Sequence, residues 1–179
     1  MATDLMLDME TLATSNEAVI LTFGAIKFNP FTDMIGESIY FRINVDEQLA
    51  LGREVNDSTI EWWSKQKEEV REEAMSDGDD RISLDQFTIE LNRFLVGCKN
   101  VWAQGTMFDI GMLEHLYKQI GKPVPWQFWQ IRDSRTLLSV LGDPRDKNAQ
   151  GAHNALADAV SQAVAVQEVI KKYNIKENN

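Results

Sequence analysis

The fold of this chain is decided by three apolar stretches near its start: DLMLDM (residues 4–9), AVILTFGAIKF (residues 18–28) and ESIYFRINV (residues 37–45). The second is rich in branched apolar residues, and the third alternates apolar with polar residues, as β-strands do. The link at residues 29–36 contains Asn, Pro and Gly, which favour turns. We therefore expect an antiparallel meander of three strands.

The rest of the sequence changes to longer segments with helical spacing. Helices are expected at residues 58–72, 83–96, 109–120, 134–141 and 154–173, short strands at 100–103 and 128–131, and polar loops at 77–81 and 143–151. Strands followed by alternating helices and strands indicate a mixed sheet with helices on its faces. The expected fold class is therefore α/β, with a three-strand meander plus parallel strands, flanked by helices.

The size and composition indicate an ordinary soluble globular protein. The 179 residues, 44% hydrophobic and 26% charged, are enough for a single domain, expected at residues 1–175, with a frayed tail at 176–179. Cys98 is the one cysteine, so no intrachain disulfide can form. A reducing cytoplasm is the expected location. No signal peptide and no membrane span are expected.

The net charge of −10 bears on any function that involves a polyanion. A protein that holds nucleic acid by neutralising many phosphates carries a basic surface, and this chain is acidic. Its acidity favours a small substrate footprint, such as the end of a strand. The negative charge has two interpretations, a solvated surface or ligands for metal ions that reverse the local sign, and both can hold.

Two acidic residues lie close together in the first expected strand. Asp8 and Glu10 are two positions apart, so both point to one face of the strand while Met9 points to the other. Adjacent carboxylates repel each other, and a cation between them would relieve the repulsion. Taken alone, such a pair at a strand end is more often simply solvated.

Two further acids and a histidine lie later in the chain. Asp109 is expected at the start of a helix, where it could also be a first-turn acid stabilised by the helix dipole. His153 is expected just before the last helix, and Asp158 in its second turn, in line with Ala155 and Gln162. Small residues around Asp158 would let this helix approach the sheet closely enough to bring that carboxylate near the acids of the first strand.

Together these residues resemble one enzyme family. D-x-E-T at residues 8–11, F-D at 108–109 and H-x-A-x-x-D at 153–158 occur in this order in the DEDDh 3′→5′ exonucleases, which include proofreading subunits and ribonuclease T. The resemblance extends from residue 4 to about residue 170 and implies a ribonuclease H-like fold. One position departs from the pattern: Gly105 stands where Asn is preferred, three residues before the Phe.

Two other segments resemble a narrower group. STIEWW at residues 58–63 and FWxxRDxRT at residues 128–136 are similar to the phage exodeoxyribonuclease A group and to small bacterial exoribonucleases. This likeness supports the enzyme class more than it supports DNA over RNA as the substrate. If a phage encodes the protein, the likeness implies the cytoplasm of the host as its location.

The resemblance implies a two-metal-ion mechanism with Mg²⁺ or Mn²⁺ as the two cations. Asp8 would bridge both ions, Glu10 and Asp158 would complete the first site, and Asp109 would hold the second, through water. His153 would take the proton from the attacking water. The product would be a nucleoside 5′-monophosphate released from a nucleic-acid 3′ end.

Four residues are expected to contact the substrate: Thr11, Trp62, Trp63 and Phe108. Phe108 could press on a terminal base or sugar, and the tryptophans could stack on bases. Adjacent helical residues point about 100° apart, so we expect one of the two tryptophans to be buried and the other to face the cleft.

Residues near the second motif segment leave alternatives open. Arg132 and Arg135 could contact phosphate or could pair with nearby acids. Asp133 is expected to be the N-cap of the helix that follows it.

Two other functions are alternatives to the exonuclease. The first is an inactive ribonuclease H-like module that serves binding or assembly, and the second is an endonuclease of the ribonuclease H type. The complete acidic set with His153 favours the exonuclease. No protein partner can be inferred from the sequence.

Overall fold

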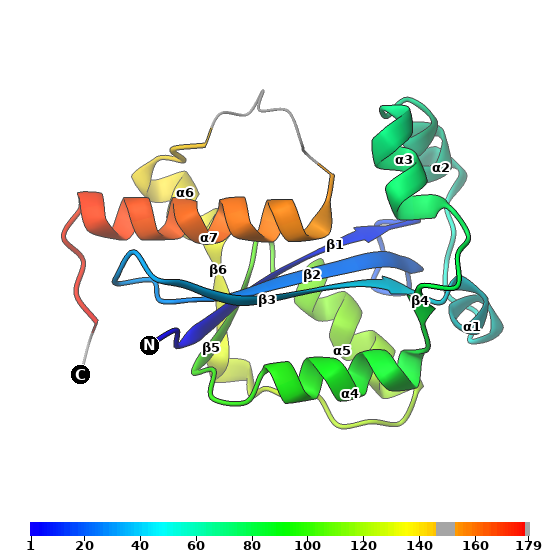
Figure 1. Ribbon diagram of the computed structural model, residues 1–179, viewed down its shortest axis with the longest axis horizontal. Helices are drawn as coiled ribbons and strands as arrows, with labels where there is room; N and C mark the ends of the chain where they lie inside the picture. The colour runs from blue at the N-terminus through cyan, green and yellow to red at the C-terminus, as the bar shows by residue number, and fades with distance from the viewer. Residues whose placement is uncertain (146–152, 178–179) are drawn as a thin grey trace.

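A six-stranded mixed sheet in the order β4-β3-β2-β1-β5-β6 forms the centre of the molecule (Figure 1). A computed structural model describes residues 1–145 and 153–177. The strands are β1 (Asp4–Thr11), β2 (Ile20–Phe28), β3 (Ile35–Ile43), β4 (Arg81–Ile82), β5 (Asn100–Ala103) and β6 (Ile131–Asp133). β1, β2 and β3 are antiparallel, whereas β5 is parallel to β1, β6 to β5 and β4 to β3. The expected meander with added parallel strands is confirmed.

Helices cover both faces of this sheet. They are α1 (Val45–Ala50), α2 (Asp57–Ser64), α3 (Glu68–Met75), α4 (Leu84–Phe94), α5 (Asp109–Gln119), α6 (Ser134–Leu141), α7 (Ala155–Lys172) and the 3₁₀ helix η1 (Phe128–Gln130). In Figure 1, α6 and α7 lie above the sheet, α4 and α5 lie below it, and α2 and α3 stand beside the end of β1. Among the described residues, none of these helices combines the length and the apolar character that a membrane crossing requires.

Strand β1 separates the two layers of the core. Leu5, Leu7 and Met9 point into the larger cluster, which α4 and α5 cover. Met6, on the opposite side, points into the smaller cluster under α7. Because side chains alternate along a strand, Asp8 and Glu10 lie on the same side as Met6. The sheet therefore presents both acids to the layer that contains α7.

Helix α7 packs on β1 and β2 through small and branched side chains. The buried apolar residues on the side of α7 that faces the sheet form one cluster with Met6, Ile26 and Phe28 of the strands. They are Ala159, Ala163, Val166 and Ile170. Asn154 caps the helix, and its side chain accepts the backbone N–H of Ala157 at 3.0 Å. The N-terminus of α7 is thereby fixed over the middle of the sheet.

Two expected elements were wrong in detail. The segment 58–72 is two helices, because α2 ends at Ser64 and α3 starts at Glu68. The backbone N–H groups of Lys65 and Gln66 bond to carbonyls three residues earlier, which closes the first helix without a Gly or Pro to mark the break. The segment expected as a strand at 128–131 is mainly η1, and strand β6 begins at Ile131.

Two short elements and part of a loop complete the comparison. Asn44 follows the last residue of β3 and caps α1, a helix that was not expected. Strand β4 lies at the end of the expected loop 77–81. Of the expected loop 143–151, residues 146–151 lie outside the described part of the chain. In the expected tail, Lys99 forms an ion pair with Glu177 at 3.0 Å, and residues 178 and 179 lie outside the described part.

Candidate active site

Three carboxylates converge where the N-terminus of α7 crosses the sheet. Asp8 and Glu10 come from β1, and Asp158 comes from α7. Asp158 lies in the first turn of that helix, whereas the sequence analysis expected it in the second. One carboxylate oxygen of each lies within 4.8 Å of the others, so the three could hold a metal ion. Glu10 is buried, whereas Asp8 and Asp158 are half-buried and remain accessible to a ligand.

Asp109 approaches the same place from the other layer. Strand β5 pairs with β1 only as far as Trp102 opposite Met6, and the chain then leaves the sheet and begins α5 at Asp109. The Asp109 carboxylate is 3% exposed and accepts a hydrogen bond from the backbone N–H of Met9. Its negative charge acts on Asp8 and Glu10, which places it beside the cluster. It is not one of the three residues within 4.8 Å of one another.

The close approach of α7 depends on Gly24, which the sequence analysis did not single out. Gly24 is the β2 partner of Asp8 across the sheet. A Cβ atom there would lie 2.2 Å from the backbone nitrogen of Leu156 and 2.4 Å from the carbonyl carbon of Ala155. Only glycine lets the helix backbone come this close. The sequence did contain a signal for this contact, because a glycine inside an apolar strand often marks a close approach of another backbone.

Gln162 was also missed as a residue of the site. Its side-chain amide donates to Asp8 Oδ1 at 2.8 Å, and the residue is 4% exposed. The available signal was its position one helical turn after Asp158, on the same face of α7. Gln162 therefore fixes the orientation of the Asp8 carboxylate, as partners of metal ligands commonly do.

Two buried glutamine oxygens lack a partner in the described part of the chain, and one of them belongs to Gln162, which contacts Asp8. Gln162 Oε1 and Gln104 Oε1 have no hydrogen-bond partner among the described residues. Gln104 directly follows β5 and precedes Gly105. Buried acceptors in native proteins are normally satisfied, by protein, water or an ion. The three carboxylates form an all-oxygen donor set, which suits Mg²⁺ or Mn²⁺ better than zinc.

The ionisation of the four acids reflects their crowding. Burial, together with the negative charge of Asp158, raises the pKa of Asp8 to about 7, although the hydrogen bond from Gln162 opposes the rise. Burial and the charges of Asp8 and Asp158 raise the pKa of Glu10 to about 9. Burial also raises the pKa of Asp109 and that of Asp158. A bound cation would remove this penalty by compensating the buried negative charge.

His153 lies directly before α7, next to the acids. Its backbone N–H donates to Asp158 Oδ2 at 2.8 Å. The residue has a φ of +74°, a left-handed conformation that non-glycine residues adopt only when their surroundings impose it. The hydrogen bond to Asp158 is one such constraint. The same carboxylate thus belongs to the acidic cluster and holds the histidine backbone.

The two tryptophans of α2 differ in burial as expected. Trp63 is 1% exposed and donates from Nε1 to the carbonyl of Thr11 at 2.9 Å, which attaches α2 to the end of β1. Trp62 is 39% exposed and contacts the His153 ring edge-to-face, with ring centroids 4.7 Å apart. Trp62 therefore lies at the site, while Trp63 anchors the helix that carries it.

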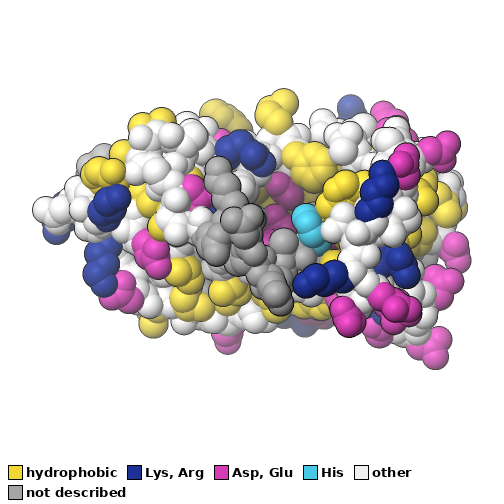
Figure 2. All heavy atoms as spheres, turned by 90° about the horizontal axis from the view of Figure 1, so that it is seen from above, with side chains coloured by type: hydrophobic (Ala, Val, Ile, Leu, Met, Phe, Trp, Pro, Cys, Tyr) yellow, Lys and Arg dark blue, Asp and Glu magenta, His cyan; other side chains and the backbone are white. Residues whose placement is uncertain are grey.

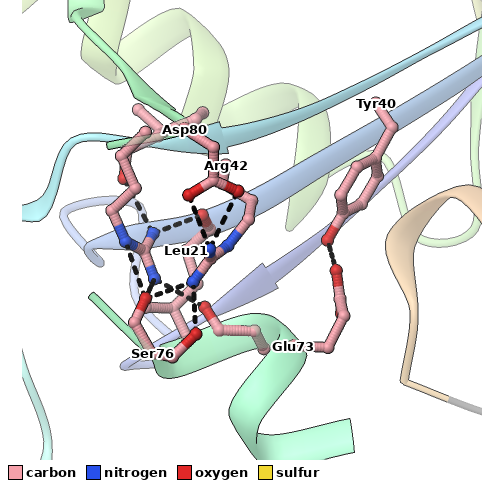
Figure 3. A network of polar contacts seen from close by, with 9 residues as sticks. Leu21, Tyr40, Arg42, Glu73, Ser76 and Asp80 are labelled. Atoms are coloured by element: carbon pink, nitrogen blue, oxygen red, sulfur yellow. Dashed lines mark hydrogen bonds and ion pairs between the residues drawn. The ribbon is translucent and has the colours of Figure 1, made fainter. Parts of the chain in front are cut away.

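A polar network attaches α3, the helix after α2, to the sheet (Figure 3). Arg42 of β3 binds both carboxylate oxygens of Asp80 at 2.7 and 2.9 Å and donates to the Ser76 backbone carbonyl. In the same view, the Tyr40 hydroxyl points to the Glu73 carboxylate and donates to it. The charge of Glu73 also contributes to the raised pKa of Glu10, so this network borders the acidic cluster.

The other expected residues lie around this centre. Thr11 is buried, and its hydroxyl donates to the Ala13 carbonyl at 2.7 Å. Phe108 is partly buried and packs against the larger core cluster. Asp133 caps α6 as expected, because its carboxylate accepts from the backbone of Thr136 at 3.0 Å and of Gly105 at 2.9 Å.

The surface around the acids is not basic. Figure 2 views the molecule from above the α7 layer and shows a histidine next to a group of acidic side chains. The Lys and Arg side chains visible on this face lie apart from one another, mixed with acidic ones. Among the described residues, the basic side chains on this face are therefore scattered rather than gathered into one patch.

Known proteins are similar to this chain in sequence. Residues 3–170 match the family described as the 3′-5′ exoribonuclease Rv2179c-like domain. The exodeoxyribonuclease of Enterobacteria phage T4 is 25% identical over 170 residues, which cover 80% of this chain and 74% of that protein.

Solved structures share the fold. The zinc-bound complex of E. coli exonuclease I (ExoI) with single-stranded DNA superposes with a TM-score of 0.69 at 15% identity, over 97% of this chain. This chain spans only 41% of that exonuclease. The nuclease domain of 3′hExo, a DEDDh family member bound to rAMP, superposes with a TM-score of 0.61 at 12% identity, over 94% of this chain and 92% of that one.

The sequence match covers nearly the whole described chain, and the fold match includes every strand around the acids. The expected ribonuclease H-like architecture and the expected enzyme class are both confirmed. This chain belongs to the family of 3′-5′ exoribonuclease Rv2179c-like domains and is a 3′→5′ exonuclease.

Proposed function

We propose that this chain removes nucleotides one at a time from the 3′ end of a nucleic-acid strand, with His153 as general base and two Mg²⁺ or Mn²⁺ ions held by four carboxylates. The observation that carries the proposal is the meeting of Asp8, Glu10 and Asp158 within 4.8 Å, with Asp109 beside them. Their raised pKa values support cation binding, since desolvated carboxylates gain most from a compensating positive charge.

The roles of the carboxylates follow from their positions. The charge of Asp8 interacts with that of Asp158 and with that of Asp109, so Asp8 is our candidate for the carboxylate that would serve both ions. Glu10 and Asp158 would hold the first ion together with Asp8, and Asp109 would help to hold the second. Bound divalent ions would supply an activated water and stabilise the charge that develops on the leaving oxygen.

His153 performs the proton transfer in this proposal. The attacking water loses a proton to the imidazole, its oxygen bonds to phosphorus, and the bond from phosphorus to the 3′ oxygen of the preceding nucleotide breaks. That 3′ oxygen takes a proton from solvent, so the products are a nucleoside 5′-monophosphate and a strand with a new 3′ hydroxyl. Trp62 limits the orientations of the imidazole through its edge-to-face contact.

We propose DNA as the preferred substrate. The support is the likeness to the phage T4 exodeoxyribonuclease, at 25% identity. The description of the matching family as exoribonuclease favours RNA as the second candidate. Trp62 and Phe108 would contact the terminal nucleotide in either case, because stacking on a base does not depend on its sugar.

The experiment uses purified protein with Mn²⁺ and matched DNA and RNA oligonucleotides, single- and double-stranded, labelled at the 5′ end. A ladder that shortens from the 3′ end with time, faster for single-stranded DNA, is the expected result. Faster shortening of RNA than of DNA would show that RNA, and not DNA, is the preferred substrate. Cleavage of a circular single strand would indicate an endonuclease, and intact oligonucleotides under every condition would favour a binding module.

A further inference from the structure

Arg135 lies across a glycine at the edge of the candidate active site. It is an exposed residue in the first turn of α6, and its Nη2 donates to the backbone carbonyl of Gln104 at 2.9 Å. A Cβ atom at Gly105 would lie 3.2 Å from Arg135 Nε and 3.3 Å from Nη2. The guanidinium therefore occupies the space that a side chain at residue 105 would need.

Gly105 is the position at which this sequence departs from the pattern it resembles, which prefers Asn there. The glycine has a φ of +103°, which L residues rarely adopt, and it donates its backbone N–H to Asp133 of the α6 cap. Loss of the Asn side chain and placement of the Arg135 guanidinium thus occur at the same point in space. The group that lies beside Gly105 is therefore a cation with several N–H donors.

The charge of Arg135 acts on one side of the acidic group. Burial and Asp8 raise the pKa of Asp109, and the positive charge of Arg135 opposes this rise. Arg145 is the arginine whose charge acts on Asp8 and Asp158. Arg145 is already engaged, because it binds both carboxylate oxygens of Asp143, at 2.9 and 2.6 Å.

Arg135 has donors to spare. None of the ion pairs found among the described residues includes it, and the bond to the Gln104 carbonyl uses one of its N–H groups. Arg132, also exposed, differs because its Nη1 donates to two backbone carbonyls, those of Trp129 at 2.7 Å and Ile131 at 2.9 Å. The two arginines of one motif segment therefore have different surroundings, and only Arg135 is near an acid of the site.

We propose that the Arg135 guanidinium binds the phosphate of the nucleotide next to the one being removed, on the Asp109 side of the site. The inference rests on the proposed function. A guanidinium offers two parallel N–H groups that match two phosphate oxygens, and it keeps its charge at any working pH. In a chain with a net charge of −10, one such cation beside the acids directs the strand towards a single side.

The test compares Arg135→Gln, Arg135→Lys and the control Arg132→Gln, which removes the same charge from the same segment. Two substrates are used: a 5′-labelled single-stranded DNA oligonucleotide, and the p-nitrophenyl ester of thymidine 5′-monophosphate, which has one phosphodiester and no neighbouring phosphate. Binding of a fluorescent oligonucleotide is followed by anisotropy as the salt concentration increases.

The expected result is a selective loss. Arg135→Gln raises KM for the oligonucleotide about tenfold or more, as loss of a charged hydrogen bond does, with little change in kcat. It leaves ester hydrolysis unchanged, and it lowers the slope of log affinity against log salt by about 0.7, the value for one phosphate of a single strand. Arg135→Lys restores part of the KM, and Arg132→Gln changes neither substrate.

An equal loss of activity on both substrates would overturn the proposal, since it would indicate a structural role or an effect on the cations. An unchanged KM and an unchanged salt slope in Arg135→Gln would also overturn it. If the wild-type chain hydrolyses neither substrate, the proposed function fails, and the salt slope still decides whether Arg135 binds phosphate.

Discussion

The two ends of helix α7 lie on the same sheet but are built for different purposes. At its C-terminal end, Val166 and Ile170 belong to one apolar cluster with Phe28, and the one buried polar side chain described there, Gln167, is neutral and donates to two backbone carbonyls. At its N-terminal end, Asp158 and Gln162 face Asp8, and the helix backbone touches Gly24. One end buries hydrocarbon and the other buries carboxylates.

The difference teaches where the stability and the chemistry of this fold are located. Burial of apolar side chains is favourable by about 1.5–3 kcal/mol each, so the C-terminal end holds the helix in place. Burial of carboxylates is unfavourable without a compensating charge, and the pKa values of Asp8 and Glu10, about 7 and about 9, record that cost. The apolar end maintains the position of the acidic end.

The largest effect is expected from Asp8→Asn at the N-terminal end. Loss of the shared carboxylate should lower exonuclease activity by about 10⁴-fold or more, because each ion contributes several kcal/mol to the transition state. The fold should persist, since removal of a buried charge relieves repulsion. The control is Asp33→Asn at the other end of α7, where Asp33 pairs with Lys171 at 2.8 Å on the surface. Equal activity of the two variants would rule out the assigned role of Asp8.

His153→Ala is the second largest expected change. Removal of a general base typically lowers turnover by about 10²-fold to 10⁴-fold, while the four carboxylates still bind Mn²⁺. The matched control is His115→Ala, because His115 lies in α5 and its nearest acid is Glu17 at 3.7 Å. Activity at pH 7.5 and Mn²⁺ affinity are measured for both variants. A His153→Ala protein with wild-type turnover would show that another group accepts the proton.

Gly24→Ala should distinguish the roles of the two ends of α7, because it displaces only the N-terminal end. The added Cβ must push the backbone at Leu156 away from the sheet, and a shift of about 1 Å near the reacting groups can cost about 10²-fold in rate. Overpacking should also destabilise the fold by about 1–3 kcal/mol. Gly36→Ala in β3 is the control, since a Cβ there would lie 3.2 Å from its nearest atoms, a tight contact that needs a shift of only a few tenths of an ångström, against 2.2 Å at Gly24. Full activity of Gly24→Ala would mean that the site tolerates movement of α7.

Ile170→Ala tests the other end of the same helix. The side chain is 5% exposed, and its loss should lower the free energy of unfolding by about 2–5 kcal/mol, measured by urea denaturation. Activity per folded molecule should stay within about twofold of the wild type at low temperature. A large loss of kcat in the folded Ile170→Ala variant would mean that the two ends are not independent.

The smallest effect is expected in the pH dependence of thermal stability. Asp8 and Glu10 have pKa values of about 7 and about 9 in the folded chain, above the ordinary values of 3.8 and 4.5. Their contribution to stability is therefore fully present below pH ~4 and is lost as the pH rises through these higher values. Bound cations should reverse this loss. The Tm measured with Mn²⁺ should therefore exceed the Tm measured with a chelator, by a difference that grows between about pH 5 and 9. Each kcal/mol of added stability should raise Tm by about 2–4 °C. A constant difference would contradict the assignment.

Much of the fold could be predicted because local signals agreed with the final structure. The apolar alternation gave β1 to β3, and capping residues such as Ser83 and Asp133 marked helix starts correctly. The break between α2 and α3 could not be predicted, because no Gly or Pro lies between Ser64 and Glu68 to mark it. Strand β4 could not be predicted either, since its two residues pair with β3 across a long stretch of chain.

The candidate site was predictable in its residue types but not in its geometry. The order of Asp8, Asp109 and Asp158 along the chain indicated the family, and the structure brings Asp8 and Asp158 together with Glu10, with Asp109 close enough for its charge to interact with Asp8. The contact of Gly24 with α7 and the bond from Gln162 to Asp8 depend on how two elements far apart in sequence approach each other. Periodicity within one element carries no information about such distances.

The most direct test of the central claim is calorimetric titration of Mn²⁺ into the wild-type chain, Asp8→Asn and Asp33→Asn at pH 7.5. We expect two ions to bind to the wild-type chain and to Asp33→Asn with the same affinity, and binding to Asp8→Asn to be weakened beyond detection. Binding of Mn²⁺ to Asp8→Asn with wild-type affinity and stoichiometry would contradict the account.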